Sequence, residues 1–298
     1  MTTQSNEIKI SSEDYPSLYQ SANNASLEAQ NNHLTVIRSY LILLFLGSVL
    51  TIYADKNSVW AIIGALVFLG TLSLTIFQSV KRFDRIWYNG RAVAESVKTR
   101  AWRYMMRAEP YFDAENVQVV RASLRNDLRE ILKQNMNLGV HLGDQNSTKD
   151  IISEKMNLIR ALSLDERIEI YKRERIDNQR NWYANKAGIN RRVSKRWFIF
   201  LIVVHVAIIT LLLIQIKFPD RIFPTESLIV IAGGIITWIQ VKKYQDLTTA
   251  YSLTAHEIGI VKGESESIRS EEQFSDFVKD AENAFSREHT QWIARKDS

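Results

Sequence analysis

Residues 197–216 read WFIFLIVVHVAIITLLLIQI, a run of 20 residues without a charged side chain. A helix needs about 20 apolar residues to cross a bilayer, so this run alone predicts a membrane-spanning helix. A second uncharged run, residues 57–80, is longer still at 24 residues. These two runs exclude a soluble enzyme with one buried core.

Two shorter uncharged runs accompany them, at residues 39–54 and 227–241. Each can span a bilayer if the flanking Arg38 or Lys242 lies along the lipid and sends its charge to the interface. The average values, 46% hydrophobic residues and a mean hydropathy of −0.17, hide this clustering. We expect an all-α integral membrane protein with four transmembrane helices in two hairpins and long helical cytoplasmic extensions.

The basic residues predict the orientation of these helices. Residues 81–196 hold 25 of the 38 Lys and Arg against 15 acidic residues, a net charge of +10, whereas the connections at 55–56 and 217–226 are each neutral. Because cytoplasmic loops carry the excess of Lys and Arg, we expect the middle segment and both termini to be cytoplasmic. The overall charge of +5 then reflects topology and contact with the lipid bilayer, and no nucleic-acid partner is expected.

Prolines and capping patterns divide the rest of the chain. We expect the second helix to continue past Arg82 as far as Pro110, and the Ser163–Glu166 capping pattern to open a helix that runs to Ile216. Further helices are expected at 114–138, from Thr225 to Gly263, and from Ser270 toward Trp292. The expected divisions are a polar N-terminal tail (1–22), a first hairpin with cytoplasmic helices (23–139), a flexible loop (140–162), and a second stalk, hairpin and C-terminal helix (163–298).

The two hairpins are followed by similar sequences. Residues 80–86 read VKRFDRI after the second helix, and residues 241–247 read VKKYQDL after the fourth. Positive charge and an aromatic residue are typical of any helix that leaves a membrane on the cytoplasmic side, so this similarity has a general explanation. Because hairpin, exit sequence and cytoplasmic extension recur in the same order, we favour an internal repeat.

Three polar segments resemble a known family when taken together. They are WYNGRAVAESVKT at 87–99 with WRYMMRAEP at 102–110, RIDNQ at 175–179 with Trp182-Tyr183, and the region 274–292, which contains DAE at 280–282 and SREHTQW at 286–292. These segments resemble the SLATT proteins, bacterial two-transmembrane effectors associated with SMODS nucleotidyltransferases and SLOG domains. Two such units in tandem would cover roughly residues 20–298.

The resemblance implies a membrane effector of a prokaryotic defence or conflict system, in the inner (cytoplasmic) membrane, that forms pores or disrupts the membrane. It implies a homo-oligomer and a cytoplasmic signalling partner or nucleotide-like trigger. The cytoplasmic motif residues that it singles out are Trp87, Tyr88, Arg91, Glu95, Lys98, Trp102, Arg103, Glu109, Trp182, Tyr183, Arg287, Glu288, His289 and Trp292.

A polar stripe on the second helix could line a pore. Its residues recur at a spacing of three to four, and the fourth helix has a shorter version; the candidates are Gly64, Phe68, Thr71, Thr75, Gln78, Gly233, Thr237 and Gln240. Hydroxyls and amides on one face can line water, with Phe68 as an apolar constriction. Small residues also let helices pack closely, and Thr or Gln can bond across helices. Both interpretations stay open.

His205 is the one titratable residue well inside an uncharged run. Such a residue can gate a channel by protonation, or it can stay neutral and bond to a neighbouring helix. We favour the structural role.

No catalytic pattern is present in the sequence. There is no cysteine, which excludes disulfides, thiolate metal sites and Cys nucleophiles, and His256-Glu257 and Glu288-His289 lack the His-Glu-x-x-His spacing of a zinc site. We expect no enzyme, cofactor or metal. The sequence favours an oligomeric pore or membrane-disrupting effector, with a non-conducting membrane scaffold or sensor that recruits soluble partners as the alternative.

Overall fold

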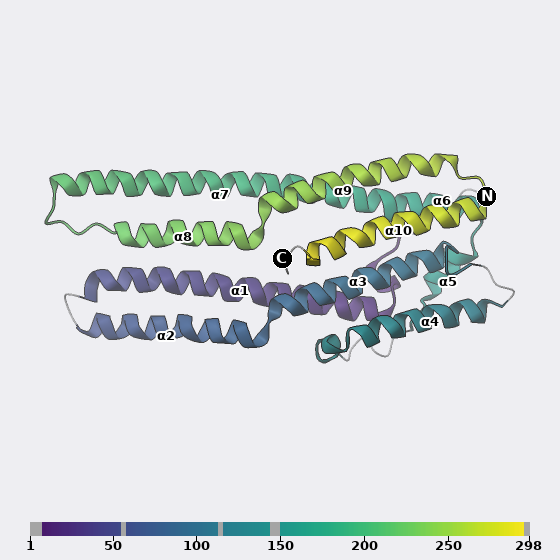
Figure 1. Cartoon of the computed structure of the whole chain (residues 1–298), viewed down its shortest axis with the longest axis horizontal. Helices are drawn as coiled ribbons and strands as arrows, with labels where there is room; N and C mark the ends of the chain where they lie inside the picture. Colours follow the sequence, from purple (N-terminus) through teal and green to yellow (C-terminus); the bar gives the residue numbers. More distant parts are fainter. Residues whose placement is uncertain (1–7, 55–57, 113–115, 144–149, 295–298) are drawn as a thin grey trace. The chain divides into compact units, whose positions relative to one another are not determined.

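The computed structural model of the chain describes residues 8–54, 58–112, 116–143 and 150–294, with side chains as far as Phe285. Regular structure in these ranges is entirely helical, and four helices are long and apolar enough to cross a membrane (Figure 1). The expected all-α membrane fold is confirmed. The α-helices are α1 (Ser17–Ala54), α2 (Ser58–Lys81), α3 (Phe83–Met105), α4 (Val117–Gln134), α5 (Glu154–Ala161), α6 (Leu164–Ile170), α7 (Asn178–Lys217), α8 (Thr225–Lys242), α9 (Tyr244–Glu264) and α10 (Glu271–Ala294).

The chain forms two compact units, and neither is continuous in sequence. The first, called the helical module here, consists of Met1–Gln30, Asp84–Tyr183 and Leu253–Ser298. The second, called the membrane unit, consists of Asn31–Phe83 and Ala184–Ser252 and holds the uncharged runs. The expected divisions followed the order of the sequence, whereas each compact unit draws on both halves of the chain.

In the membrane unit, α1 pairs with α2 and α7 pairs with α8 (Figure 1). The first hairpin packs closely at Gly47, where an added Cβ would lie 3.0 Å from the ring of Phe68. The second hairpin is held by an apolar cluster of Val204, Ile208, Ala232 and Ile235. Most other side chains in the spans are exposed, as expected for helices whose surroundings are lipid.

The expectation of one uninterrupted helix through Arg82 is wrong at that residue, and the fourth helix is interrupted in the same way at Lys243. Arg82 has φ 45° and Lys243 has φ 47°, both in the left-handed region. Their N–H groups still donate to the carbonyls four residues earlier, Gln78 (3.0 Å) and Ile239 (2.9 Å). This is the left-handed ending that closes many helices.

An aromatic residue after each interruption explains why the chain turns there. Phe83 folds back on Phe77, with ring centroids 5.7 Å apart, and Tyr244 joins the apolar cluster that contains Trp238. An apolar contact of this kind commonly accompanies a left-handed helix ending. Because VKRF and VKKY share the backbone conformation as well as the sequence, the structure supports the internal repeat.

The long helix expected from Ser163 to Ile216 is present but changes its winding. Ser163 and Glu166 form the predicted capping box at the start of α6. Residues Tyr171–Asp177 then form a π-helix between α6 and α7, a rare form that is often found at functional sites. We call these residues the π-segment.

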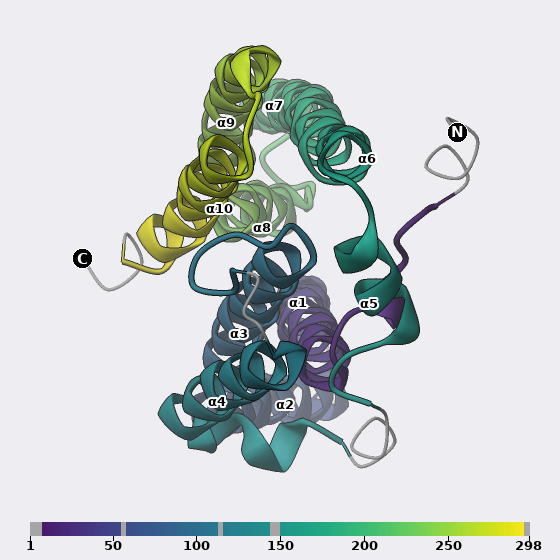
Figure 2. The same cartoon turned by 90° about the vertical axis from the view of Figure 1, so that its right-hand side faces the viewer.

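Three other boundaries differ from the expectation. Helix α1 starts at Ser17, inside the expected polar tail, because Tyr15, Tyr19 and Ala22 are buried. Helix α4 ends at Gln134, and a 3-10 helix follows from Met136 to His141. The expected flexible loop lies partly outside the described residues. Its later part contains α5, and α6 follows α5 after a short turn (Figure 2).

The core of the helical module is the apolar face of α3 with that of α10. Val93, Val97 and Ala101 on α3 are buried at helical spacing, as are Phe274, Val278 and Ala281 on α10. This pattern is typical of an amphipathic helix that packs on a partner. The helical module therefore has a core of buried apolar side chains between amphipathic helices. The membrane unit differs because many apolar side chains of its spans are exposed.

Candidate functional site

The stripe on α2 is used for packing inside the chain over much of its length. Gly64 and Thr71 are buried, and a Cβ added to Gly64 would lie 3.9 Å from Leu50 of α1. The Thr71 hydroxyl donates to the Phe68 carbonyl (2.7 Å) and that of Thr75 to the Thr71 carbonyl (2.9 Å). Packing accounts for Gly64 and Thr71, and the Phe68 ring lies against Gly47 although 44% of the residue is exposed. Thr75 is exposed and Gln78 is half-buried.

The shorter stripe, on α8, is not buried by packing within the described part of the chain. Gly233, Thr237 and Gln240 are all exposed, and the Thr237 hydroxyl donates to the Gly233 carbonyl (2.9 Å). Gly233 and Thr237 line a groove with residues of α1.

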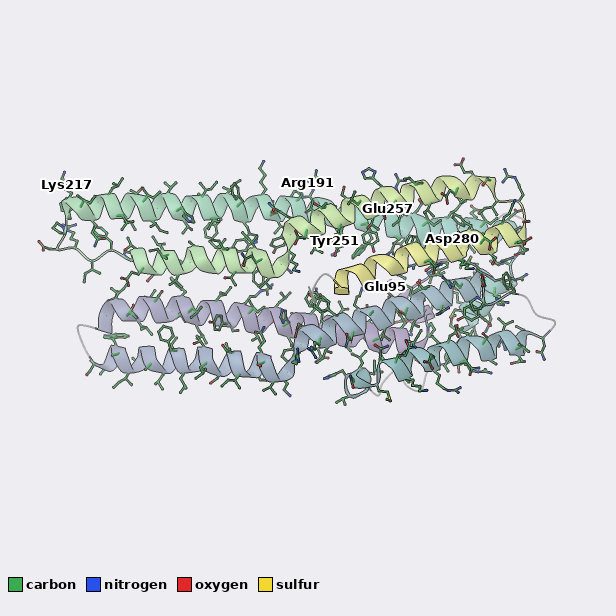
Figure 3. All side chains as sticks on the ribbon, viewed as in Figure 1. Glu95, Arg191, Lys217, Tyr251, Glu257 and Asp280 are labelled. Carbon is green, nitrogen blue, oxygen red and sulfur yellow. The ribbon has the colours of Figure 1, made fainter. Side chains whose placement is uncertain are left out.

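His205 is exposed on α7, in the middle of the uncharged run 197–216. Lys217, which follows this run, marks the end of α7 (Figure 3). Its Nδ1 lies 2.8 Å from the Leu201 carbonyl oxygen in the same helix, so the ring donates there. The expected bond to a neighbouring helix is not what the described residues show. The imidazole instead faces outward from the membrane unit.

The motif on α3 brings this helix very close to α1. Gly90 is buried, and a Cβ added there would lie 3.0 Å from the Ala22 carbonyl oxygen and 3.1 Å from Ser26. The Ser26 hydroxyl donates to the Trp87 carbonyl (2.9 Å), and the rings of Trp87 and Tyr88 stack with centroids 4.8 Å apart. This part of the motif therefore fixes helix packing.

The charged residues of the motif have separate roles. Arg91 and Glu95 form an ion pair one helical turn apart (2.6 Å). Arg103 donates to Asn283 on α10 (2.7 Å), and Glu109 pairs with Lys279 of the same helix. These residues join α3 and the turn after it to α10.

Lys98 lies over the ring of Tyr15, 5.7 Å from its centroid. Burial lowers the pKa of Lys98 to about 8.

The aromatic residues of the motif pack inside the helical module. Trp102 is fully buried, and its indole N–H donates to the Tyr15 hydroxyl (3.0 Å). Tyr183 is fully buried, and Trp182, which is more exposed, lies edge-on to it with ring centroids 5.0 Å apart. The bond from Trp102 therefore joins α3 to the residues that precede α1.

The most densely bonded carboxylate in the described part of the chain is Glu282 of α10. It accepts two bonds from Arg175, 2.8 Å from Nε and 2.7 Å from Nη2, one from the Tyr171 hydroxyl (3.0 Å) and one from the Thr99 hydroxyl (2.9 Å). The Arg175 and Glu282 side chains are 2% and 0% exposed. This buried cluster joins α3, the π-segment and α10.

The electrostatics of the cluster keep its ion pair charged. Burial disfavours the charged guanidinium of Arg175, but the charge and bonds of Glu282 outweigh burial and raise the pKa of Arg175. Burial also raises the pKa of Tyr171 well above its ordinary value, so its hydroxyl remains a donor. The Arg175 guanidinium further lies over the ring of Phe285, 4.9 Å from its centroid.

Two further buried arginines hold the turn after α3. Arg160 donates to the carbonyls of Tyr104 (2.6 Å) and Tyr111 (3.0 Å). Arg167 donates to the Met106 carbonyl (2.7 Å) and pairs with Glu271 at the start of α10. The turn is therefore fastened to α5, α6 and α10 together.

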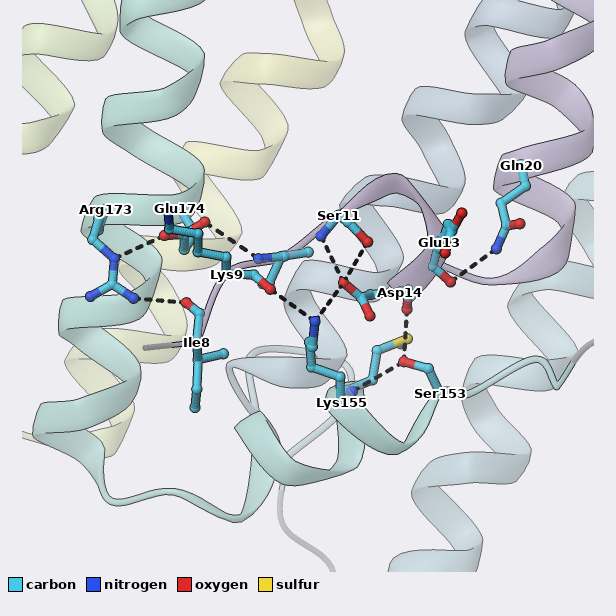
Figure 4. A network of polar contacts seen from close by, with 12 residues as sticks. Ile8, Lys9, Ser11, Glu13, Asp14, Gln20, Ser153, Lys155, Arg173 and Glu174 are labelled. Atoms are coloured by element: carbon cyan, nitrogen blue, oxygen red, sulfur yellow. Dashed lines mark hydrogen bonds and ion pairs between the residues drawn. The ribbon is translucent and has the colours of Figure 1, made fainter. Parts of the chain in front are cut away.

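The described N-terminal residues 8–15, called the N-terminal strap here, are held mainly through their backbone (Figure 4). Arg173 donates to the Ile8 carbonyl (2.9 Å) and Lys155 to that of Lys9 (3.0 Å). Lys155 also pairs with the Asp14 carboxylate (3.0 Å). Although burial alone would raise the pKa of Asp14, bonds from Ser11 and Lys155 lower it. No pattern in the sequence predicts these contacts.

Arg175 and Glu282 lie within the motifs of the sequence, but no pattern there predicts a role for them, or for Arg160, Arg167 and Tyr171. One signal was available: Glu282 falls between Val278 and Phe285 on the apolar face of α10, where a carboxylate needs a partner. The predicted Arg287, Glu288, His289 and Trp292 lie on α10 beyond the residues whose side chains the structure describes.

Comparison with known families divides the chain into two adjacent matches. Residues 16–168 match the model of the SMODS and SLOG-associating 2TM effector domain 3, and residues 171–292 match that of the SMODS and SLOG-associating 2TM effector domain 1. No curated protein and no solved structure matches the chain. The Glu282 cluster contains Thr99 from the first match and Tyr171 and Arg175 from the second, so the two matched regions share one core.

Proposed function

Because this chain belongs to the SLATT family of two-transmembrane effector domains, with two such domains in tandem, we propose that it is a non-enzymatic, homo-oligomeric pore of a prokaryotic defence system. In this proposal the pore opens across the cytoplasmic membrane when a signalling partner or a nucleotide-like trigger acts on the helical module. SLATT domains are effector domains associated with defence systems, and the chain is a multi-pass membrane protein.

The outward position of His205 is the observation that carries the proposal of assembly. An ionisable side chain is unfavourable at the centre of a bilayer and normally faces other helices or water. His205 is exposed on the membrane unit, among exposed apolar residues such as Ile202 and Ile209. A second copy of the chain, or a water-filled path between copies, would remove the imidazole from lipid.

The pore-lining residues we propose come from the predicted stripes. They are Thr75 and Gln78 on α2 and Gln240 on α8, together with His205. Gly64 and Thr71 are left out because they are buried in the first hairpin, Phe68 because its ring lies against Gly47, and Gly233 and Thr237 because they line the groove with α1.

Charge supports a cytoplasmic position for the helical module and both termini. The segment 81–196 carries a net charge of +10, and the connections at 55–56 and 217–226 are neutral. Under the positive-inside rule this favours the termini inside.

The repeated helix ending suggests how a signal reaches the membrane. Helix α3 begins directly after Arg82, and α9 begins directly after Lys243. Each hairpin therefore continues, through one left-handed residue, into a helix that enters the helical module, α3 at Asp84 and α9 at Leu253. A change in the module core would then act on both hairpins at equivalent points.

Cysteine crosslinking tests the assembly, because the natural chain has no cysteine. A His205→Cys variant in membranes should form disulfide-linked dimers on oxidation. The matched control is Val204→Cys, the adjacent residue, which is buried against α8 and should not crosslink. If both variants stay monomeric, or both crosslink equally, the proposed interface is wrong.

The alternative function is a non-conducting scaffold or sensor, and the packing of Gly64, Phe68 and Thr71 inside the hairpin favours it. Crosslinked assemblies that leave vesicles sealed would select this alternative.

A further inference from the structure

A groove on the membrane unit lies between α1 and α8. Its volume is about 360 Å³, and its lining residues include Tyr40, Leu41 and Leu44 of α1 and Val230, Gly233 and Thr237 of α8. It is open because α8 has two glycines there: a Cβ on Gly233 would meet nothing within 4 Å, and one on Gly234 would lie 3.8 Å from Leu41. The lining is mostly apolar, with Tyr40 and Thr237 as its polar residues.

Basic residues gather beside one end of this groove. The guanidinium of Arg38 lies 5.0 Å from the ring centroid of Trp238, and the Lys242 ammonium lies 5.9 Å from it. Residues 230, 234, 238 and 242 follow one another at four-residue spacing and so share one face of α8. The face that forms the groove thus continues to Trp238 and Lys242.

Within the described residues these cations have no acidic partner, because neither Arg38 nor Lys242 pairs with a carboxylate there. The positive charge of Lys186 also acts on Lys242, as does that of Arg38. Like charges repel more strongly where burial lowers the effective dielectric, and Lys242 is half-buried. An anion between these side chains would relieve the repulsion.

The size of the groove favours a thin apolar ligand. Its volume of about 360 Å³ leaves room for a thin apolar chain beside the backbone of Gly233 and Gly234. A lipid acyl chain is much narrower than a helix. Basic pockets between transmembrane helices are known to bind anionic lipid head groups.

We propose that this groove holds an acyl chain of an anionic phospholipid, with the phosphate of its head group between Arg38 and Lys242. The lipid would link α1 of the first family domain to α8 of the second. The proposed lipid site does not depend on whether the protein conducts ions. Both a pore and a non-conducting scaffold could bind the lipid there.

Native mass spectrometry of the full-length protein tests the site, with phosphatidylglycerol and phosphatidylcholine added in competition. Wild type should retain phosphatidylglycerol in preference. Arg38→Gln/Lys242→Gln should weaken that retention by about five-fold for each charge removed. The charge-preserving pair Arg38→Lys/Lys242→Arg should bind like wild type, and retained helix content by circular dichroism confirms folding.

The matched control is Lys217→Gln/Arg221→Gln. These two cations also lie over one aromatic ring, that of Phe218, at 5.8 and 5.3 Å from its centroid, but Lys217 ends α7 and Arg221 lies in the connection that leads to the start of α8. This variant should keep the preference for phosphatidylglycerol. An equal loss in both double variants, or no lipid preference in wild type, would overturn the proposal.

The position of the acyl chain in the groove is tested by a separate variant. A Cβ on Gly233 would meet nothing within 4 Å, and the Leu side chain of Gly233→Leu would occupy part of the groove, so this variant should reduce phosphatidylglycerol retention several-fold in a protein that still folds. Unchanged retention would show that the lipid does not occupy the groove and would overturn that part of the assignment.

Discussion

Arg175 and Glu282 form a two-point ion pair in the core of the helical module, with bonds of 2.7 and 2.8 Å. The residues are 107 positions apart in the chain, and one lies in the π-segment and the other in α10. The pair therefore holds the π-segment, which joins α6 to α7, against α10.

Glu282→Gln should strongly destabilise the full-length protein, because it leaves the guanidinium of Arg175 buried without a counter-charge. We expect a loss of about 3–5 kcal/mol in the free energy of unfolding, measured by denaturation in detergent. Arg175→Met/Glu282→Leu should recover most of that loss, because it removes both charges. The control is Lys262→Gln, which breaks a pair that is 39% and 35% exposed and should cost under about 1 kcal/mol. Equal losses in Glu282→Gln and the control would contradict this account of the cluster.

Gly90→Ala should lower stability by about 1–3 kcal/mol, because the new Cβ would lie 3.0 Å from the backbone oxygen of Ala22. Gly188→Ala is the matched control, since a Cβ there meets nothing within 4 Å. It should raise stability by roughly 0.5–1 kcal/mol through helix propensity. Thermal unfolding compares the two variants, and a neutral Gly90→Ala would show that α1 and α3 are not tightly packed.

Lys243→Asn and Lys243→Val remove the same charge but differ in their tolerance of positive φ. Because Lys243 has φ 47°, Asn should be accepted, whereas the β-branched Val should cost about 1–2 kcal/mol. The same difference is expected between Arg82→Asn and Arg82→Val if the two hairpins are repeats. Stability in detergent is the measurement, and a difference at only one of the two positions would argue against equivalent helix endings.

The stability contributed by Lys98 should depend on pH. Its pKa is about 8 in the folded protein and 10.5 is the ordinary value, so between these values the unfolded chain holds a proton that the folded chain has lost. Stability from this group therefore rises with pH across that interval. Lys98→Met should unfold at a higher temperature than wild type at pH 7, and its advantage should shrink between pH 8 and 10. A difference that stays constant with pH would rule out this burial effect.

The sequence predicted the features that depend on local composition. The run at 197–216 is hydrophobic enough to define a span by itself, and the Ser163–Glu166 capping box needs only neighbouring residues. Predictions failed where the local conformation depends on how side chains pack in the folded protein. The left-handed conformations of Arg82 and Lys243 follow from where Phe83 and Tyr244 pack, and no turn residue marks those positions.

The buried cluster was out of reach for the same reason. The π-segment accompanies contacts of Tyr171 and Arg175 with Glu282, which lies 111 and 107 residues away. The N-terminal strap looked like a polar tail because it is held mostly through backbone groups, which leave no pattern in the side chains. Candidate pore residues could be listed from spacing, but only the structure separated the packed Gly64 and Thr71 from the open Thr75.

Ion efflux from liposomes that contain the purified full-length protein tests the central claim most directly. It should be measured at protein densities at which His205→Cys copies crosslink. The account predicts efflux that rises more steeply than linearly with protein density, because several copies must assemble to form one path. Vesicles that stay sealed although the copies are crosslinked would contradict a pore.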